Sequence, residues 1–231
     1  MISAESADAF PAGGVVAHGS AVASPELAFS VEAVAAAGHS AVPTLCLVVC
    51  IDAGDWEIRS VALNVQLRID VVRRAYDEAE RERLFELFGA PRDWGRTLRT
   101  LRWTTTSLNV PQFSGATTVE VAVPCTYDFD VVATKYLHAL SGGDVPLKLL
   151  FSGTIFFAGA EGRLQVAHIP WDCEARCELP VRVWRDAVES AFPGTAWLRV
   201  RRDLFDRLQA YKSERALLTW DATLEELLPD E

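Results

Sequence analysis

Two neighbouring apolar segments constrain the fold most, because their side chains alternate with the two-residue period of a β-strand. In residues 44–53 both alternating sets are apolar, which predicts a central strand covered on both faces. In residues 59–71 the odd positions from Val61 to Ile69 are aliphatic, whereas most of the even positions are polar. This second pattern is typical of a strand with one buried face. A folded core built on β-structure is therefore expected.

The order of the remaining segments predicts the fold class. Residues 27–34, 117–123 and 146–158 also read as strands, and Gly153 predicts a bulge or a close backbone approach. Residues 77–88 read as a helix, and further helices follow Pro180, Asp203 and Thr219. Strands come first and helices last, which predicts an α+β fold with an antiparallel sheet, two C-terminal helices and a mixed α/β insertion.

The chain of 231 residues divides into a tail and one domain. Residues 1–25 are rich in Ala, Gly, Ser and Pro and show no period, which predicts a disordered tail; a docking role is the alternative. Residues 26–231 are expected to form a single α+β domain with an insertion at about 74–146. In the helix after Asp203, Leu204, Phe205, Leu208 and Tyr211 share one face, and we expect Asp203 to cap the helix and this face to point inward.

The charge is concentrated at the two ends of the chain. The net charge is −10, no Lys or Arg precedes Arg59, and the last eleven residues contain five acids and no base. Nucleic-acid binding needs clustered basic residues, so this class of partner is not expected. No apolar run approaches the ~20 residues that cross a bilayer, and no secretory signal is recognised, so no membrane is expected. Five cysteines, an odd number, indicate a reduced, cytoplasmic protein.

The sequence offers little evidence for catalysis. Cys46, Cys50, Cys173 and Cys177 could supply four thiolates to zinc, but their spacing differs from C-x-x-C and cysteine more often packs as a small apolar residue. Phosphate-binding glycine loops, G-x-S-x-G and H-E-x-x-H are absent from the sequence. We therefore predict no catalytic residues, no metal and no cofactor.

Aromatic and aliphatic residues in the predicted insertion form the candidate binding site. They stand among Arg96, Arg99 and Arg102, a pattern that fits a peptide-binding groove. The alternative is a second small core under the insertion. The candidate peptide-binding residues are Trp94, Leu98, Leu101, Trp103 and Phe113.

The C-terminal third resembles the SecB-like chaperones in the order of its segments. A strand over 147–157 leads through Gly159–Gly162 to an extended segment, Leu179-Pro180 opens one helix, Phe192-Pro193 closes it, and Asp203–Asp206 begins the next. Residues 74–146 have no counterpart in SecB. The whole chain is similar to an uncharacterised family of GC-rich bacteria, through the strings LNVQL, LFG-x-P-x-x-W, VPCTYDFDV, FSGTIFF and IPWDCEA. That resemblance implies a gene neighbourhood of [NiFe] hydrogenases.

Three functions are carried forward. The first, implied by the SecB-like resemblance, is a non-catalytic chaperone or assembly accessory that binds unfolded polypeptide, with a hydrogenase subunit as one partner and a homo-oligomer as one state. The second is a constitutive structural or scaffold subunit of a larger complex. The third is a small-ligand-binding protein or enzyme that uses the insertion as a lid.

Overall fold

One strand, β2 (Thr44–Ile69), runs the full length of the sheet and pairs with four other strands. The computed structural model describes residues 24–38, 40, 42–125, 131–159, 162–191, 193–195 and 199–228, so the predicted tail up to residue 23 lies outside it. The two strands predicted at 44–53 and 59–71 are halves of β2. They are joined through residues 53–56, which have no partners in the register with β4 (Phe113–Pro124). Gly54 turns here at a φ of 57°.

The neighbours of β2 lie in two lines along its sides, all of them antiparallel to it. One side pairs first with β4 and then with β3 (Leu101–Val110), which are separated only by Pro111 and Gln112. The other side pairs with β1 (Ala28–Ala36) over the first half of β2 and with β5 (Asp144–Ala158) over the second half. The far side of β5 carries β6 (Leu164–His168) and β7 (Glu174–Pro180). Within the described residues these seven strands make one antiparallel sheet, which confirms the predicted α+β class.

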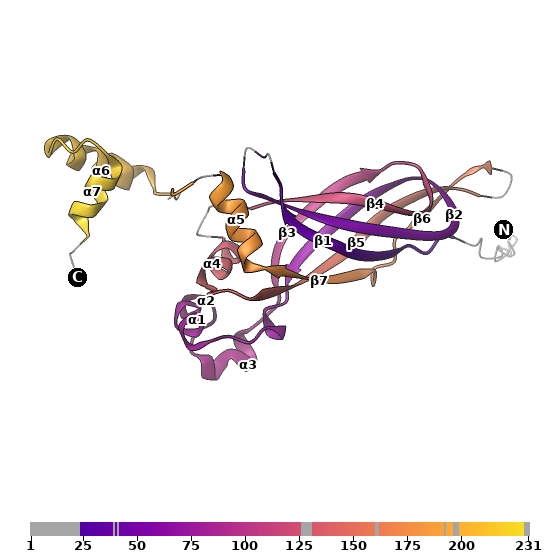
Figure 1. Cartoon of the computed structure of the whole chain (residues 1–231), viewed down its shortest axis with the longest axis horizontal. Helices are drawn as coiled ribbons and strands as arrows, with labels where there is room; N and C mark the ends of the chain where they lie inside the picture. The colour runs from indigo at the N-terminus through magenta and orange to yellow at the C-terminus, as the bar shows by residue number, and fades with distance from the viewer. Residues whose placement is uncertain are drawn as a thin grey trace, which may run out of the picture.

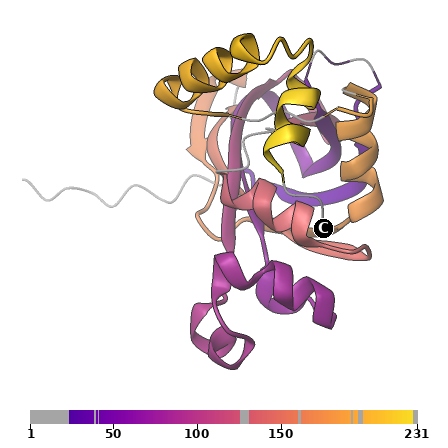
Figure 2. The same cartoon turned by 90° about the vertical axis from the view of Figure 1, so that its left-hand side faces the viewer.

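The sheet curls around a single apolar core, as the end-on view in Figure 2 shows. Residues of β1 and β5 face each other across this core, where the rings of Phe29 and Phe151 stack with centroids 4.0 Å apart. The odd positions of β2 from Leu45 to Ile69 point inward wherever the strand is paired on both sides, and they are almost fully buried. The even positions Cys46, Val48 and Cys50 are only half-buried. The expectation that residues 44–53 are covered on both faces was therefore wrong, because no second layer of described residues packs on the outer face.

The helices gather at one end of the strands (Figure 1). Short turns and helices join β2 to β3, α4 joins β4 to β5, and three helices follow β7. The bounds are η1 (Val71–Arg73), α1 (Glu78–Arg83), α2 (Phe85–Phe88), η2 (Pro91–Asp93), α3 (Trp94–Thr97), α4 (Val132–Ala139), α5 (Val181–Ala191), α6 (Arg202–Glu214) and α7 (Trp220–Leu227). The segment predicted as the insertion therefore supplies two strands of the sheet as well as the helices α1 to α4.

A buried ion pair fastens α1 to the start of β5. The guanidinium of Arg74 donates to both carboxylate oxygens of Glu80 at 2.9 Å, and it also donates to the carbonyls of Gly142 and Asp144. The side chains of Arg74 and Glu80 are only 9% and 3% exposed. Glu80 also accepts from the N–H of Ser141 and completes a capping box with Asp77. The pair is thus satisfied on all sides, as a buried ion pair must be.

Gly153 occupies a site that only glycine fits, which agrees with the close backbone approach predicted for it. Its φ is +146°, and a Cβ there would lie 2.0 Å from the carbonyl oxygen of Ala62 in the neighbouring strand β2. We expect Gly153→Ala to lower the free energy of unfolding by about 2 kcal/mol, because neither backbone can move without breaking the ladder. Urea unfolding followed by tryptophan fluorescence measures this. Gly95→Ala is the control, since that helical site has open space; an equal loss in both variants would contradict the steric explanation.

The lowered pKa of Glu80 makes the free energy of unfolding depend on pH. Burial alone would raise its pKa, but hydrogen bonds from Arg74 and the Ser141 N–H, together with the charge of Arg74, outweigh burial and lower the pKa below 4.5. A carboxyl group with a lowered folded-state pKa stabilises the fold above its unfolded pKa, and this contribution is lost as the pH falls through the folded value. Glu80→Gln should cost about 3 kcal/mol at pH 7, because it leaves Arg74 buried without its counter-charge.

The gap between Glu80→Gln and the wild-type protein should narrow as the pH falls below 4.5. Denaturant unfolding at pH 7 and at more acidic pH measures this gap. Glu78→Gln, whose side chain is 77% exposed, is the control and should have little effect at either pH. A gap of constant size would show that the charge of Glu80 is not its source.

Candidate functional site

The strand β6 has one open side. It pairs with β5 through residues 154–158, and within the described residues no strand pairs with its other side. A strand in this position presents a row of backbone N–H and C=O groups to solvent, and these groups can pair with another chain. The open edge is therefore a ready template for an added strand.

An apolar patch lies beside this open edge. The register pairs Val166 with Phe156 and Leu164 with Ala158 on the outer face, while Ala167 and Gln165 pair with the buried residues Ile155 and Phe157. Leu164 and Val166 are 64% and 56% exposed. We call Phe156, Leu164 and Val166 the β6 patch. Trp171, which is 91% exposed, stands in the turn that follows β6.

Sequence reasoning missed the β6 patch. Residues 162–175 were predicted only as extended, although Leu164, Val166 and His168 alternate with Gln165 and Ala167 in the manner of a strand. The alternation could have indicated a strand. It could not have shown which set faces outward, because Ala167 is as apolar as its neighbours.

A second apolar surface lies on α6 and α7, which we call the helical hairpin. Leu204, Leu208 and Tyr211 of α6 and Leu227 of α7 line a hollow of about 460 Å³. Residues on α6 were expected to point into the core, but none of them is buried. The expected cap was also wrong: Arg201 precedes the helix without a side-chain cap, and Asp203 lies in the first turn.

The two helices of the hairpin are held together by side-chain contacts. Arg215 pairs with Glu226 at 2.9 Å, and its guanidinium lies over the ring of Tyr211, with its carbon 3.9 Å from the ring centroid. On the other side the rings of Phe205 and Trp220 meet at 5.4 Å. Figure 1 shows the hairpin beyond α5 and away from the sheet. The hairpin therefore keeps its shape while its apolar hollow stays open.

The predicted peptide-binding residues do not form one surface. Trp94 is 9% exposed and packs edge-to-face against Tyr76 and Phe88, with its indole N–H donating to the Gly89 carbonyl. Leu98, Leu101, Trp103 and Phe113 are half-buried against the main core. Trp103 and Phe113 lie ten residues apart along the line of β3 and β4, or about 33 Å at the usual rise of a strand. Their joint role as a peptide groove stays a prediction.

The cysteines are separated by the fold, and all five are free. Cys46 and Cys50 lie on the outer face of β2, whereas Cys177 lies on β7, and the described residues contain no group of three or more potential metal ligands. Burial, with a further contribution from Glu178, raises the pKa of Cys177 to about 12, and burial also raises that of Cys125 to about 12. Both thiols are protonated at neutral pH and are therefore weak nucleophiles.

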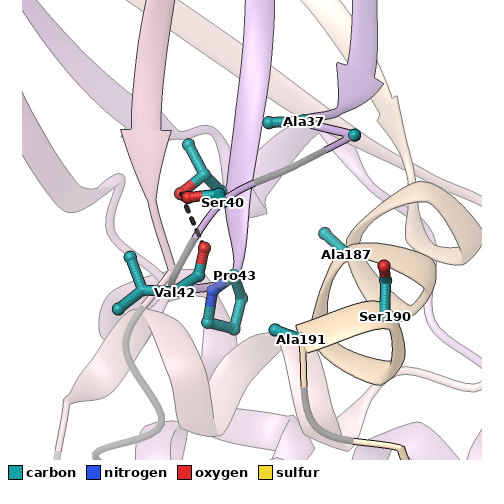
Figure 3. Close-up of a pocket in the computed structure, with 9 residues that line it drawn as sticks. Ala37, Ser40, Val42, Pro43, Ala187, Ser190 and Ala191 are labelled. Carbon is teal, nitrogen blue, oxygen red and sulfur yellow. Dashed lines mark hydrogen bonds between the residues drawn. The ribbon is translucent and has the colours of Figure 1, made fainter.

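The hollow between the β1–β2 connection and α5 offers few groups for chemistry (Figure 3). Its volume is 230 Å³, and small residues such as Ala37, Ala187 and Ser190 line it. The Thr44 hydroxyl, which also lines it, donates to the Val42 carbonyl. None of its described lining residues is ionisable. The hollow can therefore hold a small neutral group, but its described residues provide no acid or base.

No helix in the described part of the chain is both long enough and apolar enough to cross a lipid bilayer. The described residues leave two apolar surfaces open, which are the edge of β6 with its patch and the helical hairpin. Both are suited to binding another polypeptide.

Comparisons with known proteins locate the chain among its relatives. No curated protein matches it. Among solved structures, a putative late embryogenesis abundant protein aligns with 13% identity and a TM-score of 0.32, over 68% of this chain and 71% of that one. A CARDB domain from Pyrococcus furiosus, in complex with di-metal ions, gives 10% identity, a TM-score of 0.25 and coverages of 68% and 92%. β-Glucosidase 3B from Thermotoga neapolitana aligns with 9% identity and a TM-score of 0.27, over 67% of this chain and only 17% of the enzyme.

A family model matches residues 24–231, which include every residue that the structure describes. The chain therefore belongs to the family described as a family of unknown function, DUF6084.

Proposed function

We propose that this chain is a non-catalytic polypeptide-binding protein, which holds an extended segment of a protein partner by strand addition to β6. The observation that carries the proposal is the open edge of β6 beside two aliphatic side chains that are more than half exposed. An extended segment that pairs with this edge gains backbone hydrogen bonds. Its alternate side chains can pack on the β6 patch, which supplies the apolar part of the contact.

The neighbourhood of β6 makes the edge rigid enough to receive a strand. β6 pairs with β5, whose other side pairs with β2, so the edge belongs to the central sheet. The Gln165 side chain lies against Gly159. A Cβ at residue 159 would come within 2.3 Å of the side-chain amide carbon, Cδ, of Gln165. A binding edge fixed in this way loses little conformational freedom when a partner adds to it.

Other observations support a binding role in a reducing compartment. All five cysteines are free, as expected for a cytoplasmic protein, which is the compartment we propose. The buried Arg74–Glu80 ion pair is explained by its structural role, because it joins α1 to the start of β5. The hydrogenase subunit named by the sequence resemblance stays a prediction for the partner's identity.

The helical hairpin favours a second candidate function, a scaffold subunit of a permanent complex. Its apolar hollow would then be covered in the assembly rather than exposed. The two functions differ in the partner's form: strand addition needs an extended segment, whereas the hairpin fits a folded surface.

Strand addition predicts a dependence on both the β6 patch and the backbone of the bound segment. The probe is a fluorescein-labelled ten-residue peptide of alternating Val and Thr, and its binding is measured by fluorescence anisotropy. Val166→Lys should weaken binding by about tenfold or more, because it places a charge beside the edge and removes an apolar contact. The matched control is Val72→Lys. Val72 lies in η1, away from β6, and is 59% exposed, so this variant should bind the peptide normally.

A second probe tests the hydrogen bonds themselves. The same peptide with alternate backbone nitrogens methylated loses the donors along one edge but keeps its side chains. We expect it to bind much more weakly than the parent peptide. Equal binding of the two peptides, or normal binding by Val166→Lys, would overturn strand addition at β6.

A further inference from the structure

The first described residues of the chain lie beside the turn that follows β6. Pro25 and Leu27 are buried, so the start of the described chain is held against the sheet. The Leu27 carbonyl accepts from the Cys173 thiol, whose sulfur lies 3.9 Å from the oxygen. Cys173 comes directly after the turn that carries Trp171 and directly before β7. The segment of residues 1–23, which lies outside the described residues, is therefore joined to the molecule close to the β6 edge.

The distance from this attachment point to the end of β6 is short. The Cys173 carbonyl accepts from the N–H of Phe151, whereas His168 at the end of β6 pairs with Thr154 of the same strand. Three residues of β5 separate these two levels, or about 10 Å at the usual rise of a strand. Residues 19–24 can span about 20 Å when they are extended. A strand formed by the residues just before 19 can therefore lie along β6, with its last residue near His168.

The first 23 residues contain one segment suited to such a strand. Among residues 1–23, Val15 and Val16 are the only adjacent β-branched pair, and β-branched side chains favour strands. Gly14 begins this segment and Gly19 follows it, and residues 14–18 contain no Asp, Glu, Lys or Arg. We call residues 14–18 the tail segment.

The tail segment repeats part of the sequence of β6. Residues 16–18 and residues 166–168 have the same sequence, Val-Ala-His. In a parallel, in-register pair, Val16 would lie beside Val166 on the outer face and extend the β6 patch, while the two alanines would lie side by side on the face toward the core. The parallel direction is also the one that gives the connection through residues 19–24 its shorter path. Sequence, side-chain size and chain length thus agree on one arrangement.

We infer that the tail segment adds to β6 as a parallel strand and covers the open edge when no partner is bound. The inference rests on the proposed function, because it assigns a competing occupant to the same edge. A partner must then displace the tail segment. The affinity measured for a partner is therefore its intrinsic affinity reduced by the fraction of molecules whose edge is free.

The energetics of this contact suit an occupant that can be displaced. The pair contains few residues, and parallel pairing is slightly less stable per residue than antiparallel pairing. The short connection offsets this weakness, because a short flexible linker gives an effective concentration in the millimolar range. A weak strand at this concentration occupies the edge until a tighter segment replaces it. It also keeps the edge from pairing with strands of unrelated chains.

The first test is hydrogen exchange of the full chain, followed by mass spectrometry of peptides that contain the tail segment. Exchange of the tail segment in the wild-type protein should be slower by about threefold or more than in Val166→Lys, which changes the edge and leaves the tail intact. Val72→Lys is the control and should keep the wild-type protection. The exchange is measured at two protein concentrations, because docking within one chain does not depend on concentration.

The second test is the affinity of the labelled Val/Thr peptide for a tail variant of the full chain. The double variant Val15→Lys, Val16→Lys should bind the peptide about threefold or more tightly than the wild-type protein, because the competing strand is lost. The matched control is Ile2→Lys, Ser3→Lys. It adds the same charge outside the tail segment and should bind the peptide as the wild-type protein does.

The two tests separate the failure of this inference from the failure of the proposed function. Equal exchange of the tail segment in the wild-type protein and in Val166→Lys would overturn the inference, as would equal peptide affinity of the wild-type protein and the double variant. Protection that grows with protein concentration would instead place the tail segment on the edge of a second copy. If the peptide binds neither protein, the proposed function fails, and the exchange measurement still decides whether the tail segment covers the edge.

Discussion

The continuous pairing of β2 is the constraint on which the rest of the structure depends. A 26-residue strand has backbone groups along both sides, and buried groups of this kind must find partners. β3 and β4 satisfy one side, and β1 and β5 satisfy the other. The unpaired residues 53–56 lie between the two halves, where the partner on one side changes from β1 to β5. This change lets β1 lie across the core from β5, with Phe29 stacked on Phe151.

Much of this fold could be predicted from local pattern, and the part that could not depends on pairing. Alternation located β1, both halves of β2, β4 and β5, and the order of segments indicated an antiparallel α+β fold. The sequence around Gly54 and Asp55 resembles a turn, so the two halves of β2 were expected as separate strands. Whether such a site ends a strand or only interrupts its register is decided by neighbours that are distant in sequence. Pro111 is a second such site. It separates β3 from β4, yet both strands pair with β2, one after the other along the same side.

The candidate surfaces were harder to predict, because a periodic apolar face does not say what will cover it. Leu204, Leu208 and Tyr211 recur at helical spacing and were expected to point into the chain's own core. The same spacing suits a face that packs on another molecule, and α6 has no buried residue. Trp94 shows the opposite case. Its position among arginines suggested a binding surface, yet it packs in an aromatic cluster with Tyr76 and Phe88.

The distribution of satisfied and open groups is the basis of the proposed binding role. In the described part of the chain every buried side-chain nitrogen or oxygen has a hydrogen-bond partner, including those of the Arg74–Glu80 pair. Polar groups inside the described part of the protein are thus held by other parts of the protein. Open groups lie at the surface, in the backbone edge of β6 and in the exposed apolar side chains of the β6 patch and the helical hairpin. In the proposed function the free energy of binding comes from covering these groups with another polypeptide, because backbone donors and large apolar side chains are matched best by the same groups on a second chain.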